Sequence, residues 1–336
     1  MKIVSTDNLD IQTVIEYFKK DVVVIPTETV YGLSASIYNE EALLNIFKLK
    51  RRPADNPLIV HVSSIDMLKT VIDGDIPKEY SKIIDKYWPG PISLLFKANK
   101  NVSKIVTAGL DTVLVRMPDN STVLEIINKL NEPLATPSAN ISGRPSPSCI
   151  QHTIDDFGED VHLYIDGGKC RVGLESTVFS YLSTPIILRP GGICIEQLED
   201  LLSTNISVKY NFKKDKPDEI CPGQKYKHYS PRNKFVLIMK DTEDITEFVK
   251  DFISGKKFAK IGILSHFNCK IRDKQFSNIE VYFLGSNNKE IASNLFRGLR
   301  KLDGHCDIIF TSGVSLEKEG EAVMDRMKKA AHHIIK

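Results

Sequence analysis

The sequence predicts a two-domain α/β protein whose first domain is built on a mixed sheet. Short β-branched and apolar runs alternate with amphipathic segments along the chain, as in α/β domains. At 336 residues, the chain is longer than one hydrophobic core usually supports. Residues 208–232 interrupt the alternation with three prolines and many lysines. We therefore expect a first domain over 1–207, a linker over 208–232 and a smaller second α/β domain over 233–336.

The predicted elements of the first domain follow one another at short intervals. A strand at 3–4 and a helix near 10–20 precede VVVIP, a run apolar enough for a strand buried on both faces. The polar segment TETVYGLSAS (27–36) follows that strand, where open α/β sheets usually bind ligands. The remaining expectations are helices at 39–50, 64–72, 77–87 and 120–130, and strands at 58–61, 92–97, 112–117, 176–181 and 185–189.

The second domain shows the same alternation with fewer elements. Its predicted strands lie at 235–239, 260–264, 280–284 and 307–311, and its predicted helices lie near 244–254, 288–302 and 319–335. No internal repeat relates it to the first domain, and it carries no catalytic motif.

Composition narrows the class of protein. Hydrophobic residues make up 42% and charged residues 26%, as in ordinary globular proteins, and no apolar run is long enough to span a bilayer. The N-terminus turns polar after four residues, unlike a signal peptide. The six cysteines are never closer than 21 residues and form no C-x-x-C pair, so a structural zinc site or disulfide framework is not expected. We expect a cytoplasmic protein without membrane contact.

Charge is distributed unevenly. Residues 1–210 hold 21 Lys and Arg against 26 Asp and Glu, a net of −5, whereas residues 211–336 hold 24 against 17, a net of +7. The first part is therefore not a general nucleic-acid surface. The second part is suited to meeting an anionic partner, although lysines on a small domain are more often solubilising.

The stretch KLKRRPADNPLIVHV (48–62) concentrates positive charge at a helix end. Lys50, Arg51 and Arg52 are followed by Pro53, which disfavours helix in the residue before it. Guanidinium and ammonium groups on such a turn suit a polyphosphate. The alternative is a solvated helix end whose cations complement the helix dipole.

Several well-known ligand motifs are absent from the sequence. It contains no G-x-x-x-x-G-K-[ST], no G-x-G-x-x-G after a strand, no H-E-x-x-H and no G-x-S-x-G. A P-loop nucleotide site, a dinucleotide fold, a zinc protease and an α/β-hydrolase are therefore not indicated.

Polar residues instead gather where apolar strands end. Arg116 and Arg189 each close an apolar run, and the segment ATPSAN alternates Thr136, Ser138 and Asn140 along one side of an extended chain. Each residue alone is more often structural, because Ser and Thr commonly satisfy backbone groups and a lone histidine such as His61 usually lies in a core. Several cations at strand ends together favour a bound polyanion, because buried charge is costly without a partner.

These blocks together resemble a known family. TETVYGL, K-x-R-P with NPLIVH, WPGP, VRMP, ATPSAN-SG-P, DGG, G-ESTV and LRPG, in this order, closely resemble the YrdC-type threonylcarbamoyl-AMP synthases. CPGQKYKHYSP and EAVMDRMKKAA resemble the longer, two-domain form of that family. The resemblance implies a YrdC-type twisted mixed sheet with flanking helices and a Rossmann-like C-terminal domain.

The resemblance also implies a reaction and a set of site residues. ATP, with Mg²⁺, L-threonine and bicarbonate or carbon dioxide would give threonylcarbamoyl-AMP and pyrophosphate, a nucleotidyl transfer that feeds threonylcarbamoyladenosine formation beside the tRNA anticodon. No protein metal ligand is implied. Lys50 and Arg52 would neutralise charge at the reacting phosphate. The implied ATP contacts are Lys50, Arg52, Asn56, Thr112, Ser138, Asn140, Ser146, Arg189 and Tyr226. The implied threonine contacts are Thr29, His61, Arg116, Thr136 and Ser176.

Alternatives remain open from the residues alone. A non-catalytic RNA-binding module would use the basic cluster and the −5/+7 charge split, but aromatic stacking platforms are not evident. A carbamoyl-transfer domain of a larger maturation enzyme would bring zinc-finger cysteines that this chain lacks. As partners we expect the downstream tRNA threonylcarbamoyl-transferase machinery and a weak tRNA contact. We also expect residues 211–230 to act as a lid over the active site.

Overall fold

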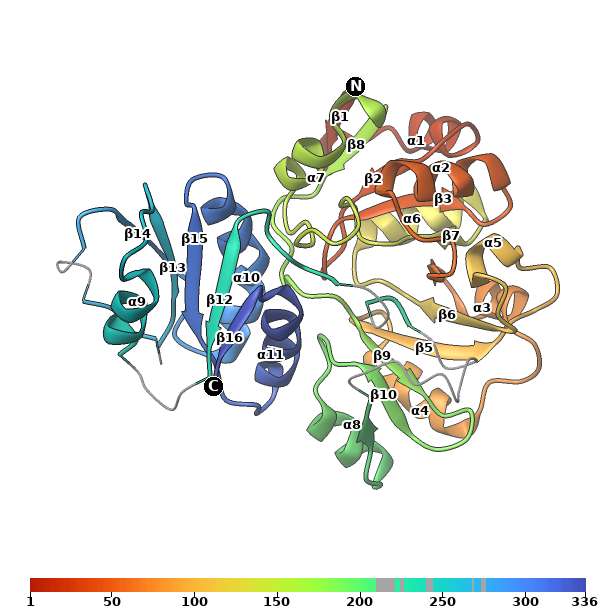
Figure 1. The fold of residues 1–336 in the computed structure, drawn as a ribbon. Coiled ribbons are helices and arrows are strands. Elements are labelled where there is room, and N and C mark those ends of the chain that lie inside the picture. Colours follow the sequence, from red (N-terminus) through yellow and green to blue (C-terminus); the bar gives the residue numbers. More distant parts are fainter. Residues whose placement is uncertain (210–220, 224–226, 240–243, 268, 273–275) are drawn as a thin grey trace. The chain divides into compact units, whose positions relative to one another are not determined.

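The computed structural model describes residues 1–336 except 210–220, 224–226, 240–243, 268 and 273–275. Its chain divides into two compact units (Figure 1). The first comprises residues 1–142 and 146–226, and the second comprises residues 143–145 and 227–336. Each unit is built on its own sheet, as the alternating pattern of the sequence predicts. None of the described helices combines the length and the apolar character needed to cross a membrane.

The first unit contains an eleven-stranded mixed sheet in the order β1-β8-β2-β3-β7-β4-β6-β5-β9-β10-β11. The sheet contains both parallel pairs, such as β4 with β6, and antiparallel pairs, such as β5 with β6, which confirms the predicted mixed sheet. The strands are β1 (Lys2–Ser5), β2 (Val23–Ile25), β3 (Gly32–Ser36), β4 (Ile59–His61), β5 (Ile92–Lys97), β6 (Thr112–Arg116), β7 (Leu134–Ala135), β8 (Leu163–Asp166), β9 (Thr177–Ser180), β10 (Ile186–Arg189) and β11 (Ser207–Val208).

Eight α-helices in the described part of this unit flank its sheet. Most begin at a side-chain cap: Asn39, Ser64 and Asn120 each accept a hydrogen bond from a backbone N–H in the first turn of the following helix. Helix α1 packs beside α6, and α4 packs beside α8. The helices are α1 (Ile11–Phe18), α2 (Glu40–Lys50), α3 (Ile65–Val71), α4 (Lys78–Tyr87), α5 (Lys104–Thr107), α6 (Ser121–Leu130), α7 (Ile150–Phe157) and α8 (Ile195–Leu202).

The central strands bury different residues on their two faces, because successive side chains of a strand point in opposite directions. Val60 of β4 and Val115 of β6 belong to the large core of the unit. Their neighbours face the other side and form a small apolar cluster with a residue from the 221–223 segment. This cluster consists of Ile59, Leu95, Leu114, Val178, Leu188 and Cys221. It forms an apolar floor on the sheet face opposite the core.

The second unit has a five-stranded parallel sheet in the order β14-β13-β15-β12-β16. The connection from β12 to β13 runs in one direction along the sheet, and those from β14 to β15 and from β15 to β16 run in the other. Helix α9 accordingly lies on one face, and α10 and α11 lie on the other (Figure 1). The strands are β12 (Lys234–Ile238), β13 (Ile261–Ser265), β14 (Ile279–Phe283), β15 (Ile308–Ser312) and β16 (His333–Ile335). The helices are α9 (Thr246–Ile253), α10 (Asn288–Asp303) and α11 (Glu319–Ala330).

Two local expectations differ from the structure. The helix predicted over 319–335 ends at Ala330, and His333–Ile335 instead adds strand β16 beside β12. The segment predicted as a polar loop over 27–36 is a loop only to Tyr31; Gly32–Ser36 pairs with β2 and β7. In both segments, backbone pairing with a strand distant in sequence determines the conformation. Local propensity does not predict this pairing.

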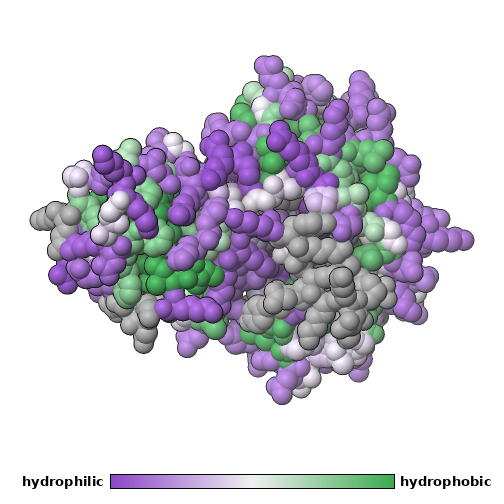
Figure 2. Space-filling view, in the orientation of Figure 1, coloured by the Kyte–Doolittle hydropathy of each residue, from purple (hydrophilic) through white to green (hydrophobic). Residues whose placement is uncertain are grey.

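The exposed surface is mixed in character. On the face seen in Figure 2, hydrophilic residues cover most of the surface, and hydrophobic residues show between them. The largest exposed apolar side chains are scattered over both units and include Tyr38, Leu44, Phe283 and Leu316.

Candidate active site

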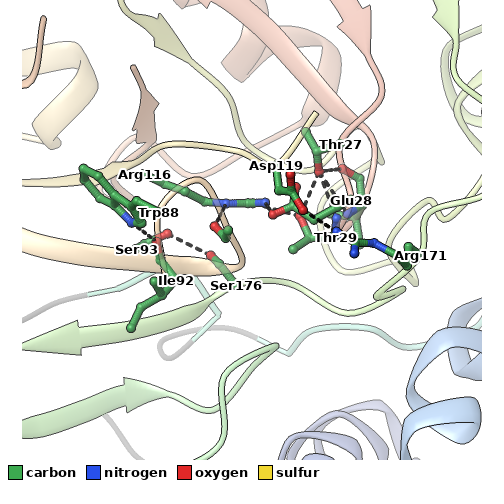
Figure 3. A network of polar contacts seen from close by, with 12 residues as sticks. Thr27, Glu28, Thr29, Trp88, Ile92, Ser93, Arg116, Asp119, Arg171 and Ser176 are labelled. Atoms are coloured by element: carbon green, nitrogen blue, oxygen red, sulfur yellow. Dashed lines mark hydrogen bonds and ion pairs between the residues drawn. The ribbon is translucent and has the colours of Figure 1, made fainter. Parts of the chain in front are cut away.

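Arg116 is the centre of a buried polar network on the face of the apolar floor (Figure 3). It ends β6 and is 4% exposed. Its Nε donates to the carbonyl oxygen of Gly90 at 3.0 Å, and its Nη1 donates to Thr29 Oγ1 at 2.8 Å. Its Nη2 lies 2.5 Å from Glu28 Oε1. The guanidinium is thus fixed in orientation by two separate segments of the first unit, the Glu28–Thr29 loop and the turn at Gly90.

His61 stands beside Arg116, because β4 and β6 pair in parallel with these two residues as partners. The imidazole is 3% exposed, and its Nδ1 makes no hydrogen bond to any described residue. Burial, with a smaller contribution from the positive charge of Arg116, holds the pKa of His61 well below its usual value. His61 is therefore a neutral imidazole at physiological pH, with one ring nitrogen open to a ligand.

Lys50 joins the end of helix α2 to the ATPSAN segment. It is the last residue of the helix and only 1% exposed. Its Nζ donates to the carbonyl oxygen of Asn140 at 2.7 Å and, at shorter range, to that of Ser138. The backbone N–H of Ser142 in turn donates to the carbonyl oxygen of Lys50 at 2.8 Å. These contacts place a buried ammonium group against the two residues that sequence reasoning grouped with it.

Arg52 is held over the polar turn that follows the helix. Its Nε donates to the carbonyl oxygen of Asn56 at 3.0 Å, and its Nη2 donates to that of Pro57 at 2.7 Å. Burial and the nearby positive charge of Arg189 lower the pKa of Arg52 to about 9, and Asp55 opposes this shift. Two like charges buried within reach of each other are unfavourable, so the pair is suited to an anion.

Arg51 behaves differently from its two neighbours. It is exposed and ends the helix in a left-handed conformation with φ of 50°. The basic cluster is therefore divided, with Lys50 and Arg52 turned into the protein and Arg51 outside.

Arg189 and Ser176 connect the neighbouring strands. Arg189 ends β10, and its Nη2 donates to the carbonyl oxygen of Ser176 at 2.9 Å. Its Nη1 also donates to the carbonyl oxygen of Pro222 at 3.4 Å. Ser176 Oγ lies 2.8 Å from Ser93 Oγ at the start of β5. Arg189 therefore lies between the start of β9 and the segment that carries Cys221.

Thr136 and Ser146 are held by side-chain hydrogen bonds. Thr136 Oγ1 accepts from Ser34 Oγ at 3.0 Å, and Ser146 Oγ donates to Glu175 Oε1 at 2.5 Å. Gly32 lies against Thr136: a Cβ added at Gly32 would lie 2.2 Å from Thr136 Cγ2. A glycine is thus required for Thr136 to occupy its place.

The remaining predicted residues lie further apart. Thr112 begins β6, four residues before Arg116, and pairs with Lys97 of β5. Thr112, Leu114 and Arg116 share one face, so the strand separates Thr112 from Arg116 by roughly 13 Å. Tyr226 and residues 211–220 and 224–225 of the proposed lid lie outside the described residues. Of the lid, residues 221–223 and 227–230 are described.

Glu28 and Ser93 are among the polar residues of this network that sequence reasoning did not assign. The role of Glu28 is not evident from the sequence, because a carboxylate in TETVYGL is typical of a polar loop. Ser93 lies in a strand whose alternation places it on the same face as Leu95, and this register was a signal that could have identified it.

A metal-binding cluster is not evident in the parts of the chain that the structure describes. No group of three or more His, Cys, Asp or Glu side chains converges there as metal ligands would.

Comparison with known proteins identifies the family of this chain. A family model described as "Telomere recombination" matches residues 17–191, and the model of the threonylcarbamoyl-AMP synthase C-terminal domain matches residues 193–332. The threonylcarbamoyl-AMP synthase of Pyrococcus abyssi is 38% identical over 94% of this chain and 92% of its own length. That of Schizosaccharomyces pombe is 41% identical over 92% of this chain and 84% of its own.

A solved structure has the same two-domain fold. The crystal structure of P. abyssi Sua5 complexed with L-threonine superposes with a TM-score of 0.90 at 35% identity, and it covers 100% of this chain and 99% of its own. Both domains and their order are shared with these relatives. The chain belongs to the threonylcarbamoyl-AMP synthase family, in its two-domain form.

Proposed function

We propose that this protein synthesises L-threonylcarbamoyl-AMP from L-threonine, bicarbonate and ATP, releasing pyrophosphate, and is thus a nucleotidyltransferase. The observation that carries the proposal is that two buried cationic places lie on one sheet face. Arg52 and Arg189 form the first, and Arg116, beside the neutral His61, forms the second. The carbamate that threonine forms with carbon dioxide and the triphosphate of ATP are both anionic where they react. A site that joins them must neutralise charge in two neighbouring places.

We assign the first of these places to ATP. Lys50, Arg52 and Arg189 supply positive charge, and Asn56, Thr112, Ser138, Asn140, Ser146 and Tyr226 complete the proposed nucleotide contacts. Magnesium would enter with the phosphates and help to neutralise them. Charge neutralisation and positioning dominate phosphoryl and nucleotidyl transfer, so these residues need no tuned general base.

We assign the second place to threonine. Arg116 binds the carboxylate, and Thr29, His61, Thr136 and Ser176 line the rest of the pocket. The P. abyssi relative was crystallised with L-threonine, which supports this part of the proposal. A pocket recognises one methyl group with about 1–3 kcal/mol, so discrimination against serine is modest.

The fate of the adenylate, the lid and the contact with tRNA also belong to this proposal. The adenylate would pass in the cytoplasm to the machinery that modifies tRNA beside the anticodon, and residues 211–230 would cover the site while it forms. The +7 charge of residues 211–336 is suited to a weak contact with tRNA.

Product identification tests the proposal. The full-length protein is incubated with ATP, magnesium, L-threonine and ¹³C-bicarbonate, and the products are analysed by mass spectrometry. We expect an adenylate that contains threonine and one ¹³C atom. Tight, salt-dependent tRNA binding without any adenylate would instead support the non-catalytic RNA-binding module.

A further inference from the structure

Glu28 carries a buried negative charge that the established family assignment does not explain. Its side chain is 2% exposed and lies against Arg116, whose side chain is 4% exposed. The 2.5 Å approach of Oε1 to Nη2 is not aligned as a hydrogen bond, and neither carboxylate oxygen of Glu28 is hydrogen-bonded to any described residue. A carboxylate offers about four acceptor positions, so most of those on Glu28 are unused.

The three nitrogens of the Arg116 guanidinium differ in their hydrogen-bond partners. Its Nε and Nη1 are occupied by the carbonyl oxygen of Gly90 and the hydroxyl of Thr29, whereas Nη2 has only the unaligned contact with Glu28. Figure 3 shows the carboxylate of Glu28 and the guanidinium of Arg116 facing each other beside Thr29. His61, on the strand paired with β6, also has a buried Nδ1 without a hydrogen bond to a described residue.

A facing cation and anion with unused hydrogen-bonding positions complement an amino-acid zwitterion. The carboxylate of such a ligand would take the open donor of Arg116, and its ammonium group brings three donors for the acceptors of Glu28. We propose that Glu28 binds the ammonium group of threonine and selects α-amino acids over hydroxy acids. This inference rests on the proposed function and adds a specificity-determining residue to it.

The competing explanation is that Glu28 only orients Arg116. In that case its loss would disturb the binding of the ligand's carboxylate and leave the ammonium group unaffected. The two explanations therefore predict opposite responses to ligands that lack one of the two charged groups.

The experiment measures binding of three probes to the full-length protein by ligand-observed NMR, which detects millimolar affinities. The probes are L-threonine, L-threoninol, which lacks the carboxylate, and (R)-3-hydroxybutyrate, which lacks the ammonium group. For Glu28→Gln we expect binding of threonine and threoninol to weaken about 10- to 100-fold, because hydrogen bonds between charged groups are lost. Binding of 3-hydroxybutyrate is expected to stay within about threefold, a difference of less than 1 kcal/mol.

Controls separate folding from recognition. Glu41→Gln removes an exposed carboxylate from helix α2 and is expected to bind all three probes as the wild type does. If Glu28→Gln does not fold, as judged by its thermal transition, Glu28→Asp keeps the charge but shortens its reach. We expect Glu28→Asp to weaken the two amine probes selectively as well.

Three outcomes contradict the proposal in distinguishable ways. Equal weakening of threonine and 3-hydroxybutyrate, with threoninol unchanged, would show that Glu28 only orients Arg116. Unchanged binding of every probe by a folded Glu28 variant would remove Glu28 from the pocket. If the wild-type protein binds no probe and releases no pyrophosphate with threonine, the proposed function fails, and the Glu28 assignment fails with it.

Discussion

Arg52 and Arg189 are buried within reach of each other's charge, at 8% and 4% exposure. Arg52 donates to the carbonyl oxygens of Asn56 and Pro57, and Arg189 donates to those of Ser176 and Pro222. None of these partners is anionic, so the carbonyl dipoles offset only part of the repulsion. A bound polyphosphate would neutralise the pair, and this relationship motivates the first prediction.

Replacing Arg52 should impair catalysis far more than folding. We expect Arg52→Ala to lower kcat/KM for ATP at least about 100-fold, as the loss of one electrostatic contact to a reacting group does. Its melting temperature should change by less than about 4 °C, because the lost turn contacts are offset by relief of the repulsion from Arg189. Steady-state kinetics and thermal unfolding without ligand check both parts.

Arg51→Asn is the matched control for Arg52→Ala. It removes an exposed cation and keeps a residue type that tolerates φ of 50°. We expect near wild-type kinetics from it. A large loss of melting temperature in Arg52→Ala, with ATP kinetics preserved, would assign Arg52 a structural role instead.

His61 should make stability depend on pH on the acid side. Because the folded protein holds the pKa of His61 well below 6.5, the unfolded chain binds an extra proton as the pH falls below that value. The free energy of unfolding should therefore decrease towards acid pH, by up to about 1.4 kcal/mol per pH unit from this residue. Thermal unfolding between pH 7.5 and 5 should show a smaller decrease for His61→Asn than for the wild type.

Two further histidines make a control necessary. Burial also lowers the pKa of His266 and of His332, so part of the pH dependence persists in any His61 variant. His305→Asn changes an exposed histidine and should follow the wild-type profile. Parallel pH profiles for wild type and His61→Asn would contradict the neutral, buried state of His61.

Gly32→Ala should disturb threonine use through Thr136. The new methyl group would lie 2.2 Å from Thr136 Cγ2, so the side chain of Thr136 or the backbone that carries it must move. We expect the KM for threonine to rise at least about fivefold, with a stability loss of about 1–3 kcal/mol typical of overpacking. Gly304→Ala is the control, because its Cβ would meet no atom closer than 3.7 Å. Equal effects from both changes would refute a specific contact.

Much of the first unit could be predicted from the sequence, because its signals are local. The run before His61 and the run before Arg116 are apolar and short, and both form the expected strands, with His61 and Arg116 as their last residues. The division of the basic stretch was harder: whether Lys50 or Arg51 turns inward depends on the left-handed end of helix α2. That conformation is visible only in the folded backbone.

The rest of the site depends on contacts between distant segments. Glu28 contacts Arg116, which lies 88 positions later in the sequence, and neither the residue types nor the spacing predicts this pair. The terminal strand β16 likewise forms because β12 offers a free edge almost 100 residues earlier in the chain. Sequence patterns report which face of an element is apolar, whereas pairing partners follow from the assembled sheet.

The most direct test of the central claim is a pyrophosphate-release assay with the purified full-length protein. We predict release of pyrophosphate from ATP only when L-threonine and bicarbonate are both present, with loss of either one reducing the rate to background. Hydrolysis of ATP to ADP that is independent of the amino acid would contradict the account.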